Sequence, residues 1–123
     1  LAQELTRVLK RAVPFDGVGL FTVDPATLLP TGLVVSHGID LDLTPRFIEI
    51  ELREPDFIKF RGLARRGRRA ATLSDATRGD LEQSVRYRDL VRPKGFDDEL
   101  RVVAHAGPPA SATRRACCRR RTW

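Results

Sequence analysis

The stretch GVGLFTV, residues 17–23, decides the fold class of this chain. Val18 and Leu20 lie on one side of an extended strand, and Phe21 and Val23 lie on the other. Because large apolar side chains occupy both sides, we predict a strand that is covered on both faces. Such a strand belongs to a layered protein, in which other elements cover its sheet.

The sequence on either side of this strand predicts further helices and strands. Before it, apolar residues at helical spacing between Leu1 and Val13 predict a helix that ends at Pro14. After it, Leu33 to Val35 predicts a second strand that pairs with the first in an antiparallel hairpin. Hairpin strands, with helices between the other strands, indicate an α+β fold. Further helices are expected at 44–54, 57–64 and 80–92, and further strands at 70–73 and 100–104.

Two of the expected helices carry a start signal. Thr44 is expected to cap the helix that begins there, and Pro45 follows at a position where its missing N–H does no harm. Asp80, with Gln83 three residues later, matches the pattern of a capping box. These signals place the starts of two helices on the chain.

The positive charge of the chain is concentrated at its end. The net charge is +6, but residues 1–103 hold 17 Lys and Arg against all 16 Asp and Glu. Residues 104–123 hold five arginines and no acid, and they show neither helical nor strand periodicity. We therefore predict a nearly neutral domain over 1–103, with no electrostatic case for binding nucleic acid, and a basic disordered tail over 104–123.

No set of residues suited to catalysis or metal binding is visible in the sequence. His37 and His105 have no cysteine or second histidine at ligand spacing. Cys117 and Cys118 are adjacent, a spacing at which a disulfide forms only with strain. The glycines of residues 17–19 lack the third glycine and the lysine of a phosphate loop. We expect a protein that is not an enzyme and that holds no metal or cofactor.

Three phenylalanines, Phe47, Phe57 and Phe60, are the candidate ligand-binding residues. If they face the sheet from the middle helices, they line an apolar pocket of the kind that holds a small molecule. Aromatic residues at helical spacing also fill cores. The sequence leaves both roles open.

Two charged runs have a binding interpretation and a simpler one. Arg65, Arg66, Arg68 and Arg69 could grip phosphate through their guanidinium groups, or form a solvated loop. The acidic run at 97–99 could bind a cation, but we expect a solvated turn that leads into a strand.

Four ordered segments together resemble a known family. They are FDGVGLFTVDPATLLPTGLVVSHGI at 15–39, REPDFIKFRGLAR at 53–65, ATLSDATRGDLEQSVRYRDLVRP at 71–93 and KGFDDELRVV at 94–103. This order of segments resembles the GAF-like sensory domain that precedes a helix-turn-helix in LuxR-type transcriptional regulators of actinobacteria. The resemblance covers residues 1–103.

The resemblance implies a six-stranded antiparallel sheet flanked by helices, with a pocket for a small molecule or a protein partner. It also implies a homodimer formed through helices at the domain edge, and a DNA-binding module further toward the C-terminus. The strands expected after residue 103, the closing helix and the helix-turn-helix are not recognisable. We therefore expect a sheet that is incomplete at the C-terminus, in a domain that is truncated or frameshifted.

The expected function is a non-catalytic sensory or regulatory domain of a transcriptional regulator. It would act in the cytoplasm, because no secretory signal and no membrane-spanning apolar run is visible. Two alternatives remain open at this stage. The chain could be a small basic protein that binds nucleic acid through its arginine-rich tail, or a remnant with no function of its own.

Overall fold

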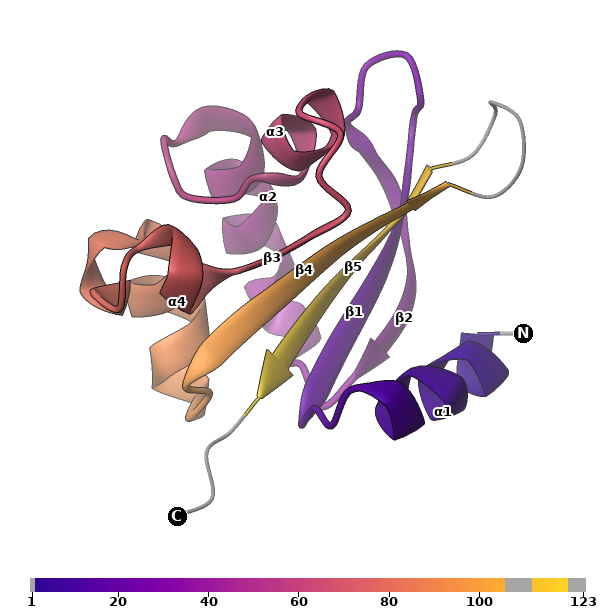
Figure 1. Ribbon diagram of the computed structural model, residues 1–123, viewed down its shortest axis with the longest axis horizontal. Helices are drawn as coiled ribbons and strands as arrows, with labels where there is room; N and C mark the ends of the chain where they lie inside the picture. The colour runs from indigo at the N-terminus through magenta and orange to yellow at the C-terminus, as the bar shows by residue number, and fades with distance from the viewer. Residues whose placement is uncertain (1, 106–111, 120–123) are drawn as a thin grey trace.

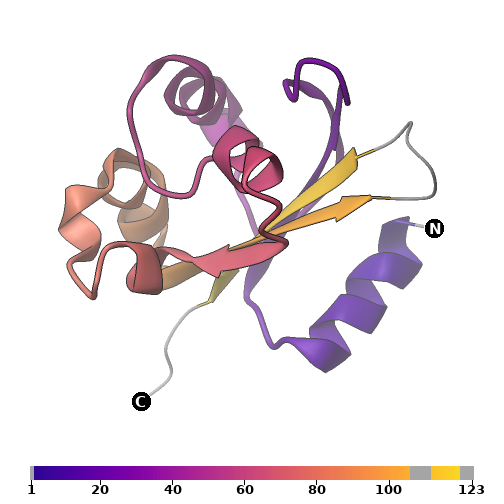
Figure 2. The same ribbon diagram turned by 45° about the horizontal axis from the view of Figure 1, so that its top comes forward.

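The computed structural model describes residues 2–105 and 112–119, which form a sheet with helices on both of its faces (Figures 1 and 2). The sheet has five strands in the order β2-β1-β5-β4-β3, and every neighbouring pair is antiparallel. The strands are β1 (Gly17–Val23), β2 (Pro30–His37), β3 (Ala70–Thr72), β4 (Asp98–His105) and β5 (Ala112–Arg119). The α+β class expected from the sequence is confirmed.

Four α-helices and several short turns cover the sheet. The helices are α1 (Ala2–Ala12), α2 (Thr44–Arg53), α3 (Phe60–Arg65) and α4 (Leu73–Ala76), and the turns are η1 (Leu41–Leu43), η2 (Leu81–Gln83), η3 (Tyr87–Val91) and η4 (Arg92–Lys94). Helix α1 lies alone on one face, while the other helices lie on the opposite face (Figure 2). The sheet therefore forms the middle layer of three.

The face of the sheet that α1 covers is held by apolar contacts. Val18 and Leu20 of β1 are buried with Phe15 in one cluster, and Leu5 and Leu9 of α1 pack against it. These α1 residues are four apart, so they project from the same side of the helix. Both side chains are partly buried, so each contributes part of the roughly 1.5–3 kcal/mol that full burial of a leucine gives, and together they help to hold α1 on the sheet.

The double coverage predicted for β1 is confirmed. Val18, Leu20 and Val23 are buried, and Phe21 is partly buried on the face that α2 covers. The predicted hairpin is also present, with Leu20 opposite Val35 in the β1–β2 register. The first helix ends at Ala12, two residues before the proline that was expected to stop it.

The single helix expected over 80–92 is broken at Ser84, between the short η2 and a helical stretch over 85–94 that includes η3 and η4. The Asp80 side chain makes no capping hydrogen bond to η2, so the predicted capping box is wrong. Ser84 is extended, and its hydroxyl donates to Asp56 Oδ2 at 3.2 Å. The backbone N–H of Arg86 donates to the same carboxylate oxygen at 2.9 Å. These contacts take the place of the backbone bonds that a continuous helix would make.

Two further helix starts differ from expectation. Thr44 is the first residue of α2 rather than its cap, and no side chain caps this helix. Helix α4 was not expected, because Leu73 continues the apolar pattern of the strand before it. The Thr72 hydroxyl starts it by accepting a hydrogen bond from the Asp75 backbone N–H at 3.2 Å.

The disordered tail expected over 104–123 is wrong for the residues that form β5. The preceding strand β4 continues to His105, and β5 lies between β1 and β4, paired with both along its length. Hydrogen bonds to two neighbours depend on the backbone, so they stabilise a strand whose side chains show no apolar alternation. Residues 106–111 and 120–123 of the expected tail lie outside the described residues.

The position of β5 also corrects the expected gap in the sheet. Gly17 lies opposite Cys118 and Asp98 lies opposite Arg119, so β5 joins the two halves of the sheet. The described residues form five strands, against the six that the family resemblance implies. Whether the arginines of this stretch bind nucleic acid stays a prediction.

Candidate functional site

A cavity of about 70 Å³ lies between β1 and the elements that cover the second face of the sheet. Its apolar wall comes from β1, η1, α2 and η3 and from the residues that connect these elements. The apolar lining residues are Gly19, Phe21, Ile39, Leu41, Leu43, Phe47, Leu90, Val91 and Phe96, and the polar ones are Asp40, Thr44, Arg86, Lys94 and Glu99. An apolar concave surface with a few polar groups is typical of a small-molecule site.

Two stacked rings form the flat part of the wall. The ring centroids of Phe21 and Phe47 are 5.0 Å apart, and their planes differ by 11°. Gly19 keeps the space beside them open, because a Cβ there would lie 3.1 Å from Phe21 Cε2. This part of the wall is therefore aromatic and apolar, and the two rings pack against each other.

A partly exposed ion pair stands among the polar lining residues. Lys94 Nζ lies 3.0 Å from Asp40 Oδ2, and Asp40 also accepts a hydrogen bond from the Asp42 backbone N–H at 3.0 Å. The hydrogen bond from Lys94, helped by this backbone contact and by the lysine charge, lowers the pKa of the Asp40 carboxyl. The carboxylate therefore caps η1 and ties it to the η4 region.

A buried ion network adjoins the cavity, and two of its members, Arg86 and Glu99, line it. Only 1% of Arg86 is exposed. Its Nε donates to Glu99 Oε1 at 2.8 Å and its Nη1 to Asp56 Oδ2 at 3.2 Å, while its Nη2 donates to the Phe57 carbonyl at 3.2 Å. Every nitrogen of this guanidinium has an acceptor, which offsets the cost of removing its charge from water.

The second arginine of the network, Arg101 of β4, is fully buried. Its Nε donates to Glu99 Oε1 and its Nη1 to Glu51 Oε2, both at 2.8 Å. Among the described residues its Nη2 has no hydrogen-bond acceptor. The guanidinium carbon lies 4.1 Å from the ring centroid of Phe60 and 5.5 Å from that of Phe47, so both rings attract its charge.

The network stays ionised because its charges support one another. Burial alone raises the pKa of the Glu99 carboxyl, but the charges of Arg101 and Arg86, with their hydrogen bonds, bring it below its ordinary value. For the Arg101 guanidinium, burial alone lowers the pKa, but the carboxylates of Glu51 and Glu99 bring this pKa above its ordinary value. These paired charges join α2, β4 and the turn before η3.

We predict that the protein loses stability in acid through Glu99. The pKa of this carboxyl is lower in the folded than in the unfolded chain, so its contribution is complete above the ordinary value of 4.5 and is lost as the pH falls through the folded pKa. Within that window Glu99 contributes a slope of up to about 1.4 kcal/mol per pH unit. Urea unfolding between pH 3 and 7 should show this slope, and Glu99→Gln should reduce it. Equal slopes in both proteins would contradict the assignment.

The three candidate phenylalanines lie in different places, and one of them lines the cavity. Phe47 lines the cavity, as expected. Phe60 does not line it: the ring is 1% exposed and packs with Leu63 and Val103 in the core. Phe57 is also absent from the cavity wall, and its carbonyl accepts the hydrogen bond from Arg86. Phe47 also packs against the core cluster that holds Phe60, but of these two residues it alone reaches the cavity wall.

Sequence reasoning missed the charged members of the site. The solvated acidic turn expected at 97–99 is wrong, because Glu99 is 3% exposed and Asp98 accepts a hydrogen bond from the Ser74 backbone N–H at 3.0 Å. One signal was present: β4 alternates, and Glu99, Arg101 and Val103 share the face that packs against α2 and α3. A charged pair on the covered face of a strand indicates buried ion pairing.

The described residues contain neither a membrane-spanning helix nor a group of metal-ligating side chains. No helix in the described part of the chain has the length and apolar character needed to cross a membrane. Residues 2–105 and 112–119 also contain no group of three or more His, Cys, Asp or Glu side chains that could hold a metal ion. The cytoplasmic location stays a prediction.

The chain is similar to known proteins in structure rather than in sequence. No protein-family model matches the chain, and no curated protein matches it by sequence. Among solved structures, the chain is similar to the VqsR LBD domain from Pseudomonas aeruginosa, with a TM-score of 0.62 and 18% sequence identity. The match covers 97% of this chain and 70% of that chain. The likeness shows that the two proteins share a fold.

Proposed function

We propose that this chain is the non-catalytic, ligand-binding sensory domain of a transcriptional regulator. The observation that carries the proposal is the apolar cavity against β1, with the stacked rings of Phe21 and Phe47 in its wall. The fold of an LBD, a ligand-binding domain, in the solved neighbour supports it. The finer assignment, a GAF-like domain of a LuxR-type regulator that dimerises through edge helices, rests on the sequence resemblance.

The geometry favours a small, flat and mostly apolar ligand. The cavity holds about 70 Å³, below the roughly 300–1,000 Å³ of pockets that enclose drug-sized molecules. A larger ligand would have to move η1 away from η3 and η4, and an exposed ion pair between Asp40, next to η1, and Lys94 of η4 holds η1 to η4. Exposed pairs of this kind are weak, so this pair does little to keep the cavity narrow.

We predict that filling the cavity abolishes binding of a small aromatic probe. Indole, titrated into the isotope-labelled chain, should shift the amide resonances of β1, η1 and η3. Leu43→Trp should remove these shifts, because Leu43 is a partly exposed lining residue and the larger ring would occupy the space. Leu29→Trp is the matched control, since Leu29 is 38% exposed and lies outside the cavity wall. Unchanged indole shifts in Leu43→Trp would contradict the proposed site.

The regulatory role needs a separate experiment. The whole chain can be fused to a DNA-binding module that represses a reporter gene only as a dimer. The level of repression by this fusion should change when a ligand occupies the cavity. The Leu43→Trp fusion should lose this dependence and the Leu29→Trp fusion should keep it. Ligand binding without any change in repression would support a binding protein and contradict a sensory domain.

A further inference from the structure

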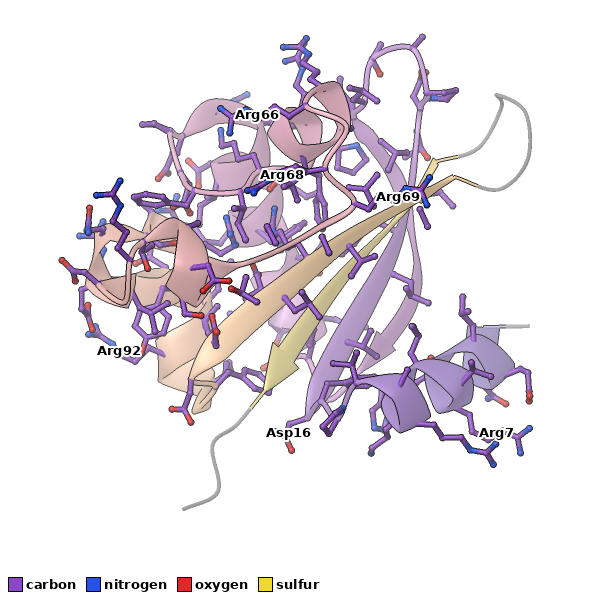
Figure 3. All side chains as sticks on the ribbon, in the orientation of Figure 1. Arg7, Asp16, Arg66, Arg68, Arg69 and Arg92 are labelled. Carbon is purple, nitrogen blue, oxygen red and sulfur yellow. The ribbon has the colours of Figure 1, made fainter. Side chains whose placement is uncertain are left out.

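A second concave surface lies beside α3, and it differs from the cavity in both position and charge. This groove has a volume of about 290 Å³ and shares no lining residue with the cavity. Five of its lining residues are cations, and we call the surface the basic groove: Lys59, Arg61, Arg65, Arg66 and Arg68. Figure 3 shows Arg66 and Arg68 at α3 and the loop that follows it, with Arg69 set apart from them.

The positive charge of the basic groove is not neutralised by neighbouring acids. None of its five cations forms an ion pair within the part of the chain that the structure describes. Two acids line the groove, but Glu51 is paired with Arg101 at 2.8 Å and Asp56 with Arg86 at 3.2 Å. Elsewhere on the surface, Arg7, for example, has an acidic partner. The groove therefore attracts anions.

A glycine inside α3 leaves the helix backbone open toward this groove. Gly62 is the third residue of α3, where glycine lowers helix stability relative to alanine. It lines the groove, and a Cβ there would meet no atom within 4 Å. Packing within the protein thus gives no reason for a glycine at this position. A missing side chain in the groove wall allows a ligand to approach the helix closely.

We propose that the basic groove binds a compact oligophosphate, such as inorganic triphosphate or the triphosphate part of a nucleotide. Four of its five cations are arginines, whose planar forks bind phosphate oxygens in pairs. Its volume, about 290 Å³, is close to the roughly 300 Å³ at which small-ligand pockets begin, which suits a compact anion. This site is independent of the proposed aromatic ligand, because the two surfaces share no residue.

Calorimetric titration of the full chain with sodium triphosphate, in 150 mM sodium chloride, tests the proposal. The unchanged protein should bind triphosphate, and the double variant Arg61→Ala/Arg65→Ala should bind it at least tenfold more weakly. The control Arg11→Ala/Arg88→Ala removes the same charge from exposed positions outside the groove, and should bind within twofold of the unchanged protein. All four side chains are exposed and without ion pairs in the described residues, so thermal melts should stay equal.

Three results would overturn the oligophosphate site. The first is no heat of binding at millimolar triphosphate with the unchanged protein. The second is equal weakening in the two double variants, which would indicate a response to net charge alone. The third is binding of a 20-base-pair DNA duplex that triphosphate does not displace, which would mean an extended nucleic-acid surface. Indole binding at the cavity should persist in the Arg61→Ala/Arg65→Ala variant, so failure of one site is distinguishable from failure of the other.

Discussion

Replacing Arg101 by methionine should lower the free energy of unfolding by about 3–5 kcal/mol, the usual cost of removing one partner from a buried ion pair. Of its hydrogen bonds within the described residues, Glu51 would keep the one from the Phe60 backbone N–H, at 2.7 Å. Glu99 would keep only Arg86 as a positive neighbour. Since whole domains are stable by about 5–15 kcal/mol, urea unfolding should show a large drop in the midpoint.

The matched control for this variant is Arg7→Met. Arg7 pairs with Glu4 at 2.6 Å, but the two side chains are 63% and 59% exposed on α1, and Figure 3 shows Arg7 on the outer side of that helix. Exposed pairs contribute about 0–1 kcal/mol, so Arg7→Met should change stability by no more than that. Similar losses in the two variants would mean that the network around Arg101 is not buried as described.

Truncating Phe60 to alanine should cost about 3–5 kcal/mol, the usual range for phenylalanine in a core. Its ring is 1% exposed and packs against Leu63 and Val103. The truncation also removes the ring face that lies 4.1 Å from the guanidinium carbon of Arg101. Because Phe60 does not line the cavity, indole should still bind the folded fraction of this variant with nearly unchanged affinity.

Phe57→Ala provides the comparison for Phe60→Ala. The same atoms are removed from a side chain that is only partly buried, and the Phe57 carbonyl can still accept from Arg86. We expect less than half the loss of stability seen for Phe60→Ala, measured by thermal or urea unfolding. A larger loss of stability in Phe57→Ala than in Phe60→Ala would contradict the assignment of Phe60 to the core. Loss of indole binding in folded Phe60→Ala would mean that Phe60 lines the cavity.

The central part of the fold follows from local sequence. The alternating apolar residues of β1 predict a strand covered on both faces, and the structure confirms both contacts. Apolar residues spaced four apart in α1 predict its packing side in the same way, and Leu5 and Leu9 meet the sheet as expected. These elements are predictable because the spacing of their apolar residues matches the repeat of the element, two residues in a strand and about 3.6 in a helix.

The parts that sequence reasoning missed depend on contacts between distant segments. Strand β5 has no apolar alternation, and its place is set by pairing with β1 and β4. The helix expected over 80–92 is interrupted because Ser84 and Arg86 bond to Asp56, which lies about thirty positions earlier in the chain. Local propensity carries no information about partners at such separations, so tertiary contacts override it.

The candidate site shows the same division. Helical spacing predicts Phe47, Phe57 and Phe60 alike as lining residues, but of the three only Phe47, which stacks on Phe21 of β1, lies in the cavity wall. The Glu99 and Arg101 pair was not identified, because single charged residues near a turn usually face water. Their burial becomes clear only when β4 is placed between β5 and β3, with Glu51 of α2 paired to Arg101.

The ion network and the cavity are best understood together. Arg86 and Glu99 belong to both, so the polar lining of the cavity is held by charges that cannot rearrange without breaking buried pairs. By contrast, the pair formed by Asp40 and Lys94 is partly exposed and weak. We therefore expect the cavity to be rigid on the side of β4 and adjustable on the side of η1.

Crystals of the chain pressurised with xenon test the central claim, an apolar cavity already formed in the protein, most directly. Empty apolar cavities bind xenon, whereas polar ones hold ordered water. We predict a xenon site among the side chains of Phe21, Phe47 and Leu90, and no such site in Leu43→Trp crystals. Ordered water throughout that space, or side chains closed over it with no xenon bound, would contradict the account.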